Sequence, residues 1–144
     1  MTASKERRQA ASAPATHRRG FVNNVAPALT WTAIVFIFGG IPNPGPSTPM
    51  PFPADKLEHA AAFGVLQILA LRALRYELPG ILPRAMPWLG ALISFAIGVA
   101  LELYQLTVPN RSAELMDLAA DAVGAGLAAL VMSILEARRR SLSI

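Results

Sequence analysis

Long apolar stretches alternate with short polar connections along most of the chain. A helix needs roughly 20 mostly apolar residues to cross a bilayer. Four stretches approach that length, and they cover residues 21–41, 55–78, 87–108 and 114–137. A proline-rich segment ends the first stretch, and Pro87 opens the third as a favourable first helical residue. The pattern predicts an all-α fold, a bundle of four transmembrane helices with no additional soluble domain.

The segments that flank these stretches are polar. Residues 1–20 carry five Lys and Arg residues among Ala, Ser and Pro, so we expect a disordered cytoplasmic tail. Residues 21–137 form the membrane domain, and residues 138–144 form a basic cytoplasmic tail. A cleaved signal peptide is the alternative for the first stretch. No small-residue A-x-A site follows that stretch, which favours a helix that is retained.

Composition supports lipid as the surrounding medium. Hydrophobic residues make up 53% of the chain and charged residues 15%, against about 25% charged residues in soluble domains. The net charge of +4 could indicate nucleic acid as a partner, but the basic residues stand in short clusters between apolar stretches. A soluble four-helix bundle remains the alternative. Without cysteine, the chain forms no disulfide and no cysteine zinc site.

Charge also predicts the orientation. Eleven of the 13 Lys and Arg residues lie before the first stretch, around the connection between the second and third stretches, or after the fourth stretch. Only Lys56 and Arg111 lie near the other two connections. By the positive-inside rule, both termini are cytoplasmic in a bacterial cytoplasmic membrane. Six of the nine Asp and Glu residues lie at the outer end instead. Sorting of basic residues does not explain why these acids enter the spans.

The outer ends of three predicted helices carry ionisable groups at similar depth. Asp55 and His59 share one helix face by their i, i+4 spacing, and Glu102 and Gln105 share another by i, i+3. An ionised carboxylate near the bilayer middle costs about 2.5–3.5 kcal/mol, so such groups turn inward and pair. We expect Lys56, Arg111 and His59 to be the partners. The candidate ligand-binding residues are Asp55, Lys56, His59, Glu102, Gln105, Arg111, Glu114, Asp117 and Asp121. The alternative is a scaffold of ion pairs that fixes helix register.

Three motifs in order carry a resemblance to a known family. They are Asp55-Lys56-x-x-His59-x-x-x-Phe63, then Glu102-x-x-Gln105, then Pro109-x-Arg111-x-x-Glu114-x-x-Asp117-x-x-Ala120-Asp121-x-x-Gly124. The chain thereby resembles the VanZ-like family of small bacterial membrane proteins, whose namesake accompanies teicoplanin resistance and has no established biochemical activity. Two positions depart from the family pattern. Ala60 replaces an aromatic residue, and Asp121 replaces an asparagine, which adds a charge or a titratable proton.

Two classes of function remain open. The resemblance and the acid-rich outer end favour a cell-envelope protein without a cofactor, which binds an envelope lipid precursor or an amphiphilic glycopeptide together with membrane lipids. A membrane-embedded enzyme is the alternative, with His59, Glu102 and Asp117 as catalytic candidates for acid/base chemistry or as ligands of Zn²⁺ or Mn²⁺. We expect no resident metal, because no metal motif such as H-x-x-x-H occurs. A transport path is disfavoured, because the acids occupy one end only.

Overall fold

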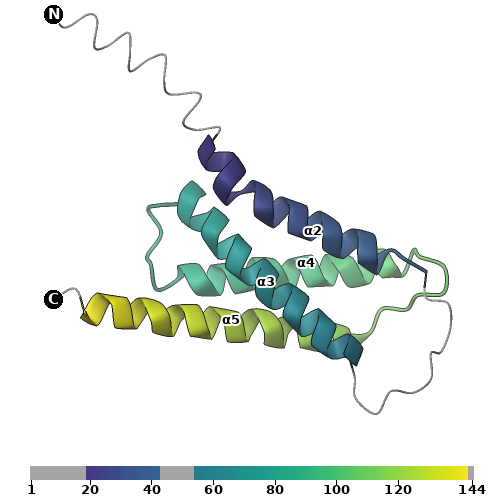
Figure 1. Cartoon of the computed structure of the whole chain (residues 1–144). Coiled ribbons are helices and arrows are strands. Elements are labelled where there is room, and N and C mark those ends of the chain that lie inside the picture. Colours follow the sequence, from purple (N-terminus) through teal and green to yellow (C-terminus); the bar gives the residue numbers. More distant parts are fainter. Residues whose placement is uncertain (1–18, 43–53, 143–144) are drawn as a thin grey trace, which may run out of the picture.

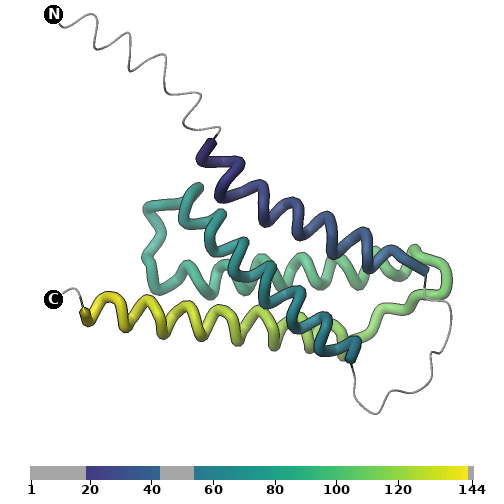
Figure 2. The backbone as a smooth tube through the Cα atoms, viewed as in Figure 1, coloured from purple at the N-terminus to yellow at the C-terminus, as the bar shows by residue number. Residues whose placement is uncertain are grey.

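The computed structural model describes residues 19–42 and 54–142, and the regular structure in these ranges is entirely helical (Figures 1 and 2). A short helical segment covers residues 19–24. The longer helices are α2 (Ala26–Gly39), α3 (Ala54–Glu77), α4 (Met86–Gln105) and α5 (Leu115–Ser141). Of the predicted tails, residues 1–18 and 143–144 lie outside this description, whereas residues 138–141 of the predicted C-terminal tail are helical.

The helices run alternately in opposite directions. In Figure 1, α2 and α4 run toward the right, whereas α3 and α5 run back toward the left. Helices α3, α4 and α5 pack against one another, and α2 packs on α3 and α4. One end of the bundle, which we call the polar end, therefore contains the ends of α2 and α4 and the starts of α3 and α5 (residues 39–42, 54–59 and 102–121).

The first predicted span is divided into two helical pieces. The break lies at Val25, between residues 19–24 and α2. Pro27 accounts for the break, because it has no amide hydrogen to donate to the carbonyl of Asn23 and its ring crowds that carbonyl. Helix α2 has 14 residues, whereas α3, α4 and α5 have 24, 20 and 27 and are long and apolar enough to cross a membrane.

The other helices lie close to their predicted ranges. Helix α3 covers residues 54–77, against the predicted 55–78. Helix α4 ends at Gln105 and not near residue 108, because Pro109 cannot donate to the Gln105 carbonyl, and the amide of Val108 bonds that oxygen at 3.0 Å instead. Asn110 then adopts a positive φ of 59° as the chain turns toward α5. Helix α5 continues to Ser141, past the predicted end at residue 137.

Many large apolar side chains face outward, and several polar ones are buried between the helices. Leu92, Leu103 and Leu127 are each about 60% exposed. Several polar side chains are at most 2% exposed, namely Gln67, Ser94, Gln105 and Asp121. In water this arrangement would expose apolar surface while polar groups lost their solvation. It suits hydrocarbon surroundings and argues against a soluble bundle.

Small residues bring α3 and α5 together. A Cβ atom on Gly124 would overlap the carbonyl oxygen of Ala60, and a Cβ on Gly64 would lie 3.5 Å from the Gly124 carbonyl. This is the close backbone approach that small residues allow between membrane helices. The contact lies about one helical turn from Asp121, so it also fixes how the polar side chains of α3 and α5 meet. An apolar cluster of Val35, Phe63, Leu66 and Leu101 fills the space beside it.

Candidate functional site

Lys56 joins α3 to the start of α5. Its ammonium group lies 2.8 Å from Glu114 Oε2 and 3.0 Å from Asp55 Oδ2, and it also donates to Asp117 Oδ1. Asp55 and Lys56 occupy the first turn of α3, while Glu114 is the N-cap residue of α5 and Asp117 lies in its first turn. One cation is therefore shared by three acids, one from α3 and two from the start of α5.

His59 lies about one turn deeper in α3 than Lys56, and it also faces α5. Its Nδ1 atom lies 2.9 Å from Oδ1 of Asp121, and its Nε2 atom lies 3.7 Å from Oδ2 of Asp117. Asp121 is fully buried, and its side chain is accommodated because residue 98 is glycine: a Cβ there would lie 2.8 Å from Asp121 Oδ2. The histidine is thereby held between two carboxylates of α5.

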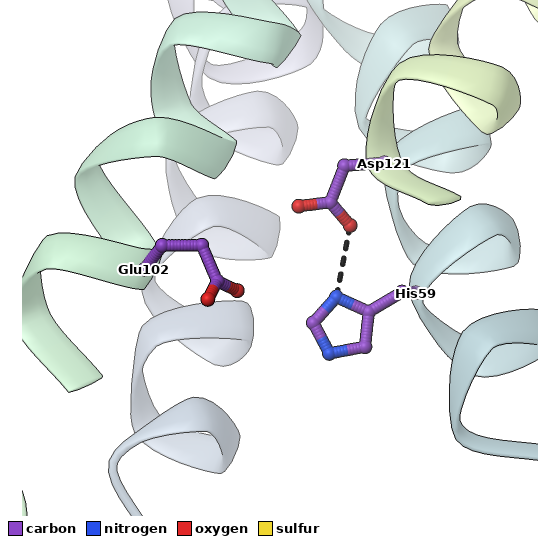
Figure 3. Close-up of side chains that lie close together, drawn as sticks. All are labelled: His59, Glu102 and Asp121. Carbon is purple, nitrogen blue, oxygen red and sulfur yellow. Dashed lines mark hydrogen bonds and ion pairs between the residues drawn. The ribbon is translucent and has the colours of Figure 1, made fainter. Parts of the chain in front are cut away.

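Glu102 approaches this pair from α4. Figure 3 shows its carboxylate directed toward the space in front of His59 and Asp121. Its Oε2 atom accepts a hydrogen bond of 2.7 Å from the backbone amide of Glu114, so Glu102 also caps the start of α5. The second oxygens of the two buried carboxylates, Glu102 Oε1 and Asp121 Oδ2, have no hydrogen-bond partner among the described residues.

A cavity of about 460 Å³ opens beside these groups. One part of its lining is polar and consists of Asp55, Glu58, His59, Gln105, Arg111, Glu114 and Asp117. The other part is apolar and comes mainly from α2, with Trp31, Ile34, Val35 and Phe38, while α3 adds Ala62 and Phe63 and α4 adds Leu101. The cavity is thus amphipathic, with ionisable groups on one side and aromatic and aliphatic side chains on the other.

The structure brings all nine sequence-predicted site residues to this end of the bundle. Six of them line the cavity, while Lys56, Glu102 and Asp121 lie behind it and are joined to the others by the bonds described above. The expected ion pair of Arg111 with a carboxylate is not formed among the described residues. Its Nε atom donates to the Ile41 carbonyl at 3.0 Å, which ties the α4–α5 connection to the end of α2.

The three residues considered as metal ligands in the enzyme alternative change by one residue in the structure. His59, Glu102 and Asp121 offer ligand atoms that all lie within 4.8 Å of one another, with Asp121 in the place expected for Asp117. Asp117 is instead held by Lys56. The depth of each residue followed from the helical rise, but the rotation of α5 about its axis decides which acid faces which partner.

The apolar part of the lining was missed by sequence reasoning. Trp31, Val35 and Phe38 follow one another at i, i+4 and i+7 on α2, a spacing that would have placed them on a single face. The indole nitrogen of Trp31 donates to the Ala62 carbonyl at 2.9 Å, which explains an aromatic residue at mid-helix and anchors α2 to α3.

The arrangement can perform two kinds of chemistry. Cations and carboxylates at the cavity mouth can pair with the charges and hydroxyl groups of a polar ligand, while the apolar wall accepts hydrocarbon. The histidine held by a buried carboxylate can exchange a proton with a bound group.

Comparisons with known proteins address the family of the chain. Curated proteins and solved structures give no match. A family model described as VanZ/LLP1 matches residues 3–136, which is nearly the whole chain and includes each of the three motifs at the polar end. With its apolar helices and buried polar groups, the chain is a membrane protein that belongs to the VanZ/LLP1 family.

Proposed function

We propose that this protein binds an amphiphile of the bacterial cell envelope, either a lipid-linked precursor or an amphiphilic glycopeptide, in the cavity at the polar end. In this proposal residues 19–39 cross the bilayer with α3, α4 and α5 as a four-span bundle. Both termini are cytoplasmic, and the polar end faces outward.

The observation that carries the proposal is the divided lining of the cavity. A head group would meet the polar side, and an acyl or prenyl chain would lie along Trp31, Val35 and Phe38 toward the lipid. At about 460 Å³ the cavity is within the range of small-molecule sites. A simple scaffold of ion pairs would have no need of such a space.

Arg111 is the residue best suited to hold an anionic head group. It lines the cavity, and its contact with the Ile41 carbonyl uses Nε, which leaves the terminal nitrogens of the guanidinium for a phosphate or carboxylate. Carboxylates nearby, such as Asp55 and Glu58, would accept hydrogen bonds from hydroxyl or amine groups of the same ligand.

Trp31 provides the test. Trp88→Phe leaves Trp31 as the single tryptophan of a chain that has two, and the purified full-length variant is titrated in detergent with a polyprenyl phosphate and, separately, with teicoplanin. We expect a saturable change in Trp31 emission with at least one of them. Arg111→Gln should weaken binding of the polyprenyl phosphate by about 10- to 100-fold, because a charge-assisted hydrogen bond contributes about 1.5–3 kcal/mol.

The reciprocal variant, Trp31→Phe, is the control, since Trp88 is 53% exposed and does not line the cavity. Its emission should show no saturable change. If neither compound changes Trp31 emission, the proposed binding function is wrong.

Catalysis is the second candidate, and the His59–Asp121 hydrogen bond of 2.9 Å beside the cavity is the observation that favours it. The same titration distinguishes the two candidates when the added compound is recovered and analysed by mass spectrometry. A binding protein returns the compound unchanged, whereas an enzyme converts it in a reaction that His59→Gln abolishes.

A further inference from the structure

The charges behind the cavity are unbalanced. Lys56 already contacts three acids, and Arg111 bonds a backbone carbonyl. Glu102 and Asp121 are therefore left with His59 as the nearest basic group among the described residues. Burying two carboxylates without a matching positive charge is costly, and the cost rises as water is excluded.

Each of these two carboxylates also keeps one oxygen that bonds to none of the described residues. Oδ2 of Asp121 belongs to a fully buried residue, and Oε1 of Glu102 belongs to a residue that is 6% exposed. Their other oxygens are occupied by His59 and by the amide of Glu114. Figure 3 shows both side chains, from α4 and α5, directed toward the same space that the imidazole of His59 borders.

We propose that His59, Glu102 and Asp121 bind one divalent cation, of the Zn²⁺ or Mn²⁺ type. Their ligand atoms all lie within 4.8 Å of one another. Atoms bonded tetrahedrally to one ion at about 2.1 Å lie about 3.4 Å apart, so side-chain shifts of up to about 1 Å complete the site. One imidazole nitrogen and two carboxylate oxygens form a set that suits these two ions, whereas Ca²⁺ requires six to eight oxygen ligands.

The surroundings fit such an ion. Its charge would balance Glu102 and Asp121, and three protein ligands would leave coordination positions for a water molecule or an oxygen atom of a bound ligand. His59 lines the cavity, whereas Glu102 and Asp121 do not, so the ion would lie at the inner edge of the cavity. This inference goes beyond the proposed function and does not depend on it, since the ion is bound by the chain alone.

The experiment is equilibrium dialysis of the full-length protein. The protein is purified in detergent, stripped with a chelator and dialysed against ZnCl₂ or MnCl₂ without added lipid, and bound metal is measured by mass spectrometry. We expect about one ion per chain, and we expect Asp121→Asn and Glu102→Gln each to weaken binding at least about tenfold, as loss of a ligand does. The matched control is Glu77→Gln, which neutralises an exposed carboxylate at the opposite end of α3.

Each outcome decides the proposal. Wild-type protein that retains no more metal than the detergent blank overturns it, and this result needs no variant to fold. Equal binding by wild type and by both site variants shows an adventitious ion and overturns it as well. Asparagine has nearly the same size and shape as aspartate, so Asp121→Asn is expected to fold, and its helical content is checked by circular dichroism. Because no lipid is present, failure here leaves the Trp31 titration as a separate test of the proposed function.

Discussion

At the scale of single residues, Lys56 supplies the positive charge that the acids at the start of α5 contact. Its side chain is 24% exposed and that of Asp117 is 11% exposed, so their contact is shielded from water. Removing one partner of such a pair leaves the other charge buried without compensation. We expect Lys56→Met and Asp117→Asn to be coupled in a double-mutant cycle by about 0.5–3 kcal/mol, with the double variant more stable than the sum of the single effects indicates.

The measurement is the free energy of unfolding in mixed detergent micelles, followed by circular dichroism. Lys56→Met combined with Glu77→Gln is the control cycle, because Glu77 lies at the far end of α3 and should show no coupling. Additive effects in both cycles would show that the Lys56–Asp117 contact contributes nothing to stability.

The depth of the site residues was predictable, but their pairing was not. The rise of about 1.5 Å per residue placed His59, Glu102 and Asp121 within one layer. The partner of each side chain depends on the rotation of the helices and on glycine at position 98, which makes room for Asp121. Spacing along the sequence does not give the rotation of a helix or show which side chain Gly98 makes room for. This is why Asp117 and not Asp121 was considered as a ligand in the metal alternative, and why Arg111 was expected in an ion pair.

At the scale of helices, the contact of α3 with α5 depends on Gly124. Gly124→Ala should lower the free energy of unfolding by about 1–3 kcal/mol, since the added methyl group overlaps the Ala60 backbone and cannot be relieved by turning a side chain. Gly126 lies two residues away on the same helix, and a Cβ there meets nothing within 4 Å. Gly126→Ala should change stability by less than about 1 kcal/mol, in the stabilising direction, because alanine favours helix.

Both variants are compared by denaturant titration in the same detergent. A Gly124→Ala protein as stable as Gly126→Ala would mean that the two helices are not in backbone contact.

The sequence predicted the existence and approximate length of α3, α4 and α5 from apolar length alone. It did not predict the break at Val25, although Pro27 was the signal for it, because prolines near a helix entrance are also compatible with an uninterrupted first turn.

At the scale of the whole molecule, the number of spans is linked to the positions of the termini. Residues 19–39 cross the bilayer only if the two helical pieces on either side of Val25 act together, and an even number of spans puts both termini on one side. A molecule in which only α3, α4 and α5 cross would place its termini on opposite sides. The charge distribution favours the first arrangement, because basic residues flank both ends of the chain.

Because the chain has no cysteine, single cysteines can report the side of the membrane directly. We expect Ser112→Cys, in the exposed α4–α5 connection, to react with a membrane-impermeant maleimide in intact cells. Ser141→Cys, at the end of α5, and Ser4→Cys should react only after the cells are permeabilised. Reaction of Ser4→Cys but not Ser141→Cys in intact cells would establish three spans, and reaction of both with protection of Ser112→Cys would place the cavity on the cytoplasmic side, out of reach of a ligand that arrives from outside.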